Sequence, residues 1–146
     1  MNMVQVYIKG QEDKELSSFL RYYPVRIKNI GMDAFFDRQV IYDFKDGRNH
    51  ADVAKCVAKM LVKVVGERTA VHGTKVKKEE RAKRLKEKNN IEVDANFFKN
   101  KIVCIWDDVV TTGTSFCAYT AQLEQVGAHV TNGIFLGKTS YKYVQQ

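Results

Sequence analysis

The pattern of apolar and polar positions is clearest in the second half of the chain. Residues 102–106 form an unbroken apolar run of strand length, which is typical of a strand covered on both faces. A loop containing Gly113 follows, and apolar residues then recur at helical spacing over residues 115–126 until Gly127 ends the pattern. Residues 130–136 predict another strand. This order predicts a βαβ unit with a right-handed crossover and a parallel sheet.

The middle of the chain predicts a strand and a helix. Residues 40–44 have the composition of a strand, and a turn at residues 45–48 follows them. Asn49 is a good N-cap, and Asp52 lies where a helix favours an acidic residue. The expected helix ends at Gly66 and has one apolar face, made by Val53, Val57, Met60, Leu61 and Val64.

The pattern before residue 39 is weaker and predicts only short elements. Residues 4–8 alternate as in a short strand, and residues 22–27 suggest a second strand, on an edge because it contains a proline. Residues 13–19 suggest a helical turn between them. We therefore expect a single domain in which residues 1–38 form a small irregular cap over an α/β core of residues 39–146.

Composition and size fit one globular domain. Hydrophobic residues make up 45% and charged residues 28% of the 146, which is the balance of an ordinary folded domain. No apolar run approaches the roughly 20 residues of a membrane span, and the N-terminus is too short and polar for a signal peptide. We expect a cytoplasmic protein without a membrane partner. The cysteines form no CxxC pair, so we expect buried thiols at Cys56, Cys104 and Cys117.

The positive charge is concentrated in one stretch. The formal net charge is +7, and residues 75–88 contribute +5 of it through eight basic and three acidic residues. A solvated helix or loop with paired charges would account for this composition. An electropositive surface for a pyrophosphate-bearing ligand or for nucleic acid would account for it equally well. Composition does not choose between these interpretations.

The loop after the strand at residues 102–106 has the chemistry to bind a phosphorylated sugar. Asp107 and Asp108 follow that strand, and ligands of open parallel sheets lie beyond the carboxyl ends of strands. The loop then enters a helix N-terminus, where unpaired N–H groups and the helix dipole favour a phosphate. Gly113 allows close approach of the backbone, and the carboxylates suit sugar hydroxyls. Further donors are the hydroxyls of Thr111, Thr112, Thr114 and Ser115.

Residues 102–115 resemble the phosphoribosyl-pyrophosphate (PRPP) motif of type I phosphoribosyltransferases. The shared features are an apolar strand, two acids, two apolar residues and then T-T-G-x-S, in which Ser115 replaces the more usual threonine. Residues 98–101 are similar to the lead-in of ComF-like members. The resemblance covers residues 97–139 and, more weakly, residues 40–66. It implies a parallel-sheet, type I phosphoribosyltransferase-like α/β fold, either complete or reduced.

The same resemblance implies an activity and the residues that support it. PRPP would bind with Mg²⁺, which PRPP rather than a protein ligand would hold, and phosphoribose would pass to an unidentified base with release of pyrophosphate. Asp107 and Asp108 would hold the ribose as catalytic residues. The 5-phosphate would bind Val110, Thr111, Thr112, Gly113, Thr114 and Ser115. Members of the family often pair, so a homodimer is a further expectation.

The chain departs from the family pattern after Gly66. A strand with a pyrophosphate-binding loop is expected there, yet residues 67–73 contain no convincing apolar run. The strand could be lost, residues could be missing near Gly66, or residues 69–71 could be a degenerate version. Binding of pyrophosphate or of another polyanion would then depend on Arg68, Lys75, Lys77 and Lys78. An alternative is a non-catalytic PRPP-sensing or nucleic-acid-linked ComF-like protein, with nucleic acid bound by residues 75–88. Lys138 lies at the end of the last strand, where it could approach the ligand, although a solvated lysine is the plainer interpretation.

Overall fold

The computed structural model describes residues 3–65, 75–76 and 91–144, and these residues form an open α/β fold. The main sheet has the strand order β1-β2-β6-β5, in which β2, β6 and β5 are parallel and β1 is antiparallel to β2. Strands β3 and β4 form a separate antiparallel pair. The elements are β1 (Val4–Gln5), β2 (Glu15–Tyr22), α1 (Met32–Lys45), α2 (His50–Val65), β3 (Lys75–Val76), β4 (Ile91–Glu92), α3 (Ala95–Phe98), β5 (Ile102–Val110), α4 (Thr114–Gln125) and β6 (His129–Thr139).

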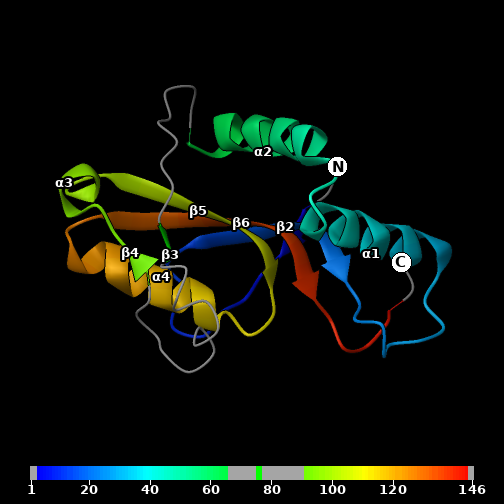
Figure 1. The fold of residues 1–146 in the computed structure, drawn as a ribbon. Coiled ribbons are helices and arrows are strands. Elements are labelled where there is room, and N and C mark those ends of the chain that lie inside the picture. Colours follow the sequence, from blue (N-terminus) through cyan, green and yellow to red (C-terminus); the bar gives the residue numbers. More distant parts are fainter. Residues whose placement is uncertain (1–2, 66–74, 77–90, 145–146) are drawn as a thin grey trace.

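The main sheet separates two clusters of buried apolar side chains. Figure 1 shows α2 over one face of the sheet and α4 over the other. On the α4 face, Phe116 packs edge-on against Phe135, with ring centroids 5.8 Å apart. On the opposite face, Ile41 of α1 and Val53 of α2 pack with Ile134. Ile134 and Phe135 are neighbours on β6 and are each 1% exposed, because β6 is an inner strand covered on both sides.

The predicted βαβ unit is confirmed as β5, α4 and β6, with β5 and β6 parallel. Gly127 ends the helical segment with a φ of +92°, as its position predicted. Strand β5 is longer than the apolar run that predicted it. It continues through the two aspartates, because Val109 and Val110 still pair with Gly137 and Lys138 of β6.

The N-terminal strands β1 and β2 belong to the main sheet, so the prediction of a small irregular cap over the core was wrong for them. The helical turn predicted over residues 13–19 is instead most of β2, which pairs in parallel with β6. Ser18 is fully buried there, and its hydroxyl donates to the Leu20 carbonyl at 2.8 Å. The strand predicted over residues 22–27 is also wrong, because β2 ends at Tyr22 and the Ile27 N–H closes a turn onto the Pro24 carbonyl at 2.8 Å.

The strand predicted over residues 40–44 was wrong as well, because these residues lie in α1. Ile41 is fully buried, and its side chain contacts the backbone position of Gly137, where no Cβ would fit. Tertiary packing of this kind overrides the β preference of neighbouring β-branched residues. The following turn is confirmed, with Gly47 at a φ of +86°. Helix α2 begins directly after Asn49, as predicted.

Two further predictions concern the burial of the cysteine thiols and the absence of a membrane-spanning helix. All three cysteines are free; Cys104 and Cys117 are half-buried, whereas Cys56 is exposed, so the expectation of a buried thiol was wrong for Cys56. Burial raises the pKa of the Cys104 thiol to about 11. Among the helices of the described ranges, none has the length and apolar composition to cross a bilayer.

Candidate functional site

A pocket of about 140 Å³ lies where β5 ends and α4 begins. It contains all the residues predicted to hold the 5-phosphate and one of the two predicted ribose ligands. The residues lining it are Asp107, Val109, Val110, Thr111, Thr112, Gly113, Thr114, Ser115, Phe116 and Phe135. Asp108 is not among them. The structure therefore brings the predicted loop around one opening at the carboxyl end of a parallel strand.

The N-terminus of α4 is open toward this pocket. Gly113 is the N-cap and no side chain caps the helix. The first intrahelical hydrogen bond runs from the Cys117 N–H to the Gly113 carbonyl at 2.9 Å, so the N–H groups of the first turn have no intrahelical acceptor. Thr114 and Ser115 belong to that turn and line the pocket. Such N–H groups and the helix dipole together favour an anion.

Gly113 is required by both its backbone conformation and its neighbour. Its φ is +89°, in the left-handed region that residues with a side chain rarely adopt. A Cβ built on it would lie 2.7 Å from carbons of the Ile8 side chain. Ile8 is itself 4% exposed and belongs to the cluster on the α4 face. The N-terminal segment therefore supports the loop, a role that no local sequence signal indicated.

The threonine hydroxyls of the loop bind one another and the end of β6. The hydroxyls of Thr111 and Thr139 are 2.9 Å apart, and those of Thr112 and Thr114 are also 2.9 Å apart. Each pair needs one of its two protons for this contact, so part of the donor capacity predicted for a ligand is used internally. Ser115 forms no side-chain hydrogen bond within the described part of the chain, and its hydroxyl is available at the pocket wall.

The Lys138 side chain is hydrogen-bonded to the loop, so the interpretation as a solvated lysine was wrong. Its ammonium group donates to the Thr111 carbonyl at 2.8 Å and to the Thr139 carbonyl at 3.2 Å. Two of its three N–H groups are used, and one remains for another acceptor. The pKa of Lys138 is lowered from its usual value, first because burial disfavours the charged amine and second because Arg21 repels it.

Arg21 and Lys138 form a pair of like charges beside the pocket. Lys138 is the register partner of Val110 on one side and of Arg21 on the other. Because register partners on neighbouring strands point to the same face, the two cations lie on the side of the sheet from which Val110 lines the pocket. Neither forms an ion pair with an acid in the described ranges. An anion between them would reduce their repulsion.

The two aspartates differ in position, although each carboxylate accepts a hydrogen bond from the N–H of the next residue. Asp107 accepts a hydrogen bond from the Asp108 N–H at 2.8 Å, and Asp108 accepts one from the Val109 N–H at 2.7 Å. Asp107 lines the pocket, whereas Asp108 is not among the residues around it. The pair therefore offers one carboxylate to a ligand in this pocket.

The remaining predicted contacts lie mostly outside the described residues. Arg68, Lys77 and Lys78 are outside them, as are residues 69–71, one predicted place for a degenerate pyrophosphate strand. Lys75 is described only as the backbone of β3, paired with Glu92. In the described ranges no group of three or more His, Cys, Asp or Glu side chains could hold a metal ion.

Comparison with known proteins found no match: no family model, no curated protein and no solved structure is significantly similar to this chain. The interpretation of the site therefore depends on its own geometry and on the motif in the sequence.

Proposed function

We propose that the pocket at the end of β5 binds the ribose 5-phosphate part of PRPP, and that the chain is a phosphoribosyltransferase-like protein. The observation that carries the proposal is the open N-terminus of α4 facing a pocket that also contains the Asp107 carboxylate. A phosphate suits the first-turn N–H groups. A sugar hydroxyl suits the carboxylate, which only accepts hydrogen bonds. These two partners are joined in one molecule in a ribose 5-phosphate.

The charges around the pocket support a ligand with more than one anionic group. A dianionic phosphate at the helix N-terminus would gain roughly 0.3–1 kcal/mol from the dipole alone. Arg21 and Lys138 are further cations at the same edge of the sheet. The pocket volume of about 140 Å³ is below the roughly 300–1,000 Å³ of pockets that enclose drug-sized ligands. It suits the phosphate and the adjoining sugar, with the pyrophosphate of PRPP outside it.

In a transfer reaction the chain would act mainly by positioning and by charge. The bond between C1 of the ribose and the pyrophosphate oxygen would break, and pyrophosphate would leave with the bonding electrons. The bond from C1 to a base nitrogen would form, and that nitrogen would lose its proton to water. The loop would fix the 5-phosphate, and Asp107 would fix the ribose hydroxyls. Mg²⁺ bound to the pyrophosphate would neutralise its charge. Arg21 and Lys138, or the predicted contacts Arg68, Lys75, Lys77 and Lys78, would assist through their positive charge.

The test compares two neighbouring aspartates by calorimetric titration with ribose 5-phosphate and with PRPP plus Mg²⁺. Asp107→Asn and Asp108→Asn each remove one negative charge, and the amide oxygen of asparagine can still accept the backbone N–H that each carboxylate holds. We expect Asp107→Asn to weaken binding by about tenfold, or about 1.4 kcal/mol. Asp108→Asn is the matched control and should bind within about twofold of the unmodified protein.

Three results would separate binding from catalysis and from failure of the proposal. Absence of heat with both ligands would refute the proposal. An equal loss in the two variants would show that net charge, and not contact in this pocket, governs binding. Binding without pyrophosphate release, when PRPP is supplied with each common nucleobase, would favour the non-catalytic PRPP sensor over the transferase.

A further inference from the structure

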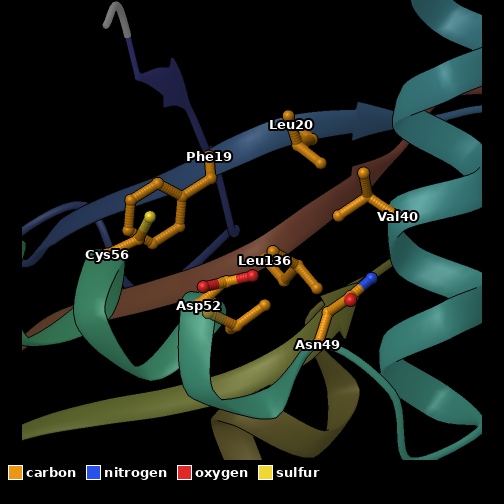
Figure 2. Close-up of a pocket in the computed structure, with 8 residues that line it drawn as sticks. Phe19, Leu20, Val40, Asn49, Asp52, Cys56 and Leu136 are labelled. Atoms are coloured by element: carbon orange, nitrogen blue, oxygen red, sulfur yellow. The ribbon is translucent and has the colours of Figure 1, made fainter.

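A second and larger pocket lies on the opposite face of the main sheet, between α1, α2 and the strands β2 and β6 (Figure 2). Its volume is about 320 Å³, at the lower end of the range for pockets that bind small molecules. Leu136 lines it, whereas the preceding residue, Phe135, lines the pocket described above. The residues around it are Phe19, Leu20, Val40, Asn49, Asp52, Val53, Cys56 and Leu136.

The floor of this pocket is apolar and fixed by the core. Phe19, Val53 and Leu136 are buried members of one core cluster. The Phe19 ring is held edge-on against Trp106, with centroids 6.5 Å apart. These side chains come from a strand, a helix and another strand, so the floor is shaped by the packing of the whole domain. An apolar ring or short chain would remove its own surface and that of the floor from water.

The rim of the pocket is polar on one side only. Asp52 and Cys56 come from the beginning of α2, and Asn49 directly precedes that helix. All three lie across from Val40 of α1, and the exposed Asp52 lines the pocket (Figure 2). Asp52 forms no hydrogen bond or ion pair with another residue of the described ranges. The pocket therefore combines an apolar floor with a carboxylate at its mouth that has no partner among the described residues.

We propose that this pocket binds a small amphipathic amine, with its apolar body on Phe19 and Leu136 and its ammonium group on Asp52. A carboxylate accepts hydrogen bonds and prefers a charged donor. An anionic ligand would be repelled by Asp52, and a neutral apolar ligand would gain nothing from this charge. The proposal is independent of the proposed function, because it uses residues on the other face of the sheet.

Cys56 provides a direct measure of occupancy. It lines the pocket and is the exposed cysteine of the three, all of which are free. A bound ligand would block access of a neutral thiol reagent to this side chain. The rate at which iodoacetamide modifies Cys56, followed by mass spectrometry of the peptide that contains it, therefore reports binding without knowledge of the natural ligand.

The experiment uses three probes of similar shape: 2-phenylethylamine, 2-phenylethanol and phenylacetate. In the full chain at pH 8, we expect the amine to protect Cys56 at a concentration about threefold below that of the alcohol, because Asp52 is exposed. Phenylacetate should not protect it. Asp52→Asn should remove the difference between amine and alcohol. Asp33→Asn, which removes an equal charge from α1 outside the pocket, should keep the difference.

Thermal unfolding of each variant checks that the fold is unchanged. Val40→Trp tests whether the probes bind in this pocket, because a large side chain at the rim should abolish protection by both amine and alcohol. Equal protection by amine and alcohol in the unmodified chain would overturn the role of Asp52. Absence of protection by all three probes would overturn the site. Protection that grows with protein concentration and needs no probe would assign the pocket to a second copy of the chain instead.

Discussion

Replacement of Gly113 by alanine should destabilise the protein through two separable effects. The first is the backbone, because alanine at a φ of +89° costs roughly 1–2 kcal/mol. The second is the new methyl group, which would lie 2.7 Å from Ile8 carbons and must displace a buried side chain. Overpacking of this kind costs roughly 1–3 kcal/mol. We expect a total loss of about 2–5 kcal/mol in the free energy of unfolding.

Gly47→Ala is the matched control for the backbone effect. Gly47 has a φ of +86°, and no atom lies within 4 Å of a Cβ added to it. Gly47→Ala should lower the free energy of unfolding by roughly 1–2 kcal/mol. Both Gly→Ala changes also reduce the entropy of the unfolded chain to the same extent, so this effect cancels when the two variants are compared. The difference between the two variants therefore isolates the collision with Ile8, which we expect at about 1–3 kcal/mol.

Urea unfolding of the unmodified chain and of each variant measures these losses through the midpoint and slope of the transition. A double variant, Gly113→Ala with Ile8→Ala, removes the side-chain atoms that collide. It should lose less stability than the sum of its two single variants, which is the signature of a direct contact. If Gly113→Ala loses no more than Gly47→Ala, or if the two single losses simply add, the contact between the N-terminal segment and the loop is not as described.

Two further predictions concern titration and thiol chemistry. The pKa of Lys138 in the folded chain is lowered below its usual 10.5, mainly by burial and then by Arg21. Between the folded-state pKa and the usual value, the unfolded chain therefore binds more protons than the folded chain. Stability should rise with pH across that window, and Lys138→Gln should remove this rise in denaturant titrations between pH 8 and 11. Burial raises the pKa of Cys104 to about 11, so iodoacetamide at pH 8 should modify Cys56 in the folded chain and reach Cys104 only after unfolding. Equal rates at the two thiols before unfolding would contradict the burial of Cys104.

The unit formed by β5, α4 and β6 could be predicted because its signals are local. The apolar runs of both strands and the helical spacing between them are contained in about 40 consecutive residues. Gly113 and Gly127 mark the two ends of the helix through their positive φ angles. The loop could be predicted for the same reason, since an uncapped helix start after a strand is a local arrangement.

The role of β2 could not be predicted, because its evidence lies at the other end of the chain. Glu15 and Leu16 pair with Asn132 and Gly133, and the polar Ser18 interrupts the apolar pattern even though it is fully buried. Helix α1 was missed for a related reason. Its core residue, Ile41, packs against strands at the far ends of the sequence, so local β preference was a poor guide.

The same distinction explains which parts of the site were missed. Residues of one loop are neighbours in sequence, and they were found together. Arg21, Ile8 and Lys138 reach the loop only through strand pairing and packing. The sequence suggested that the strand ended before the aspartates. Strand β5 instead continues to Val110, and of the two aspartates Asp107 lines the pocket.

The two proposed sites can be tested separately because one strand serves both with opposite faces. Phe135 lines the pocket at the start of α4, and Leu136 lines the pocket beside α2. The nearby charges also differ, since Arg21 and Lys138 flank the first pocket, which contains Asp107, whereas Asp52 lies at the mouth of the second. An anionic sugar phosphate is repelled by the carboxylate of the second pocket, and an amine is repelled by the cations beside the first. Because the sheet lies between them, a substitution that closes one pocket leaves binding at the other to be measured by itself.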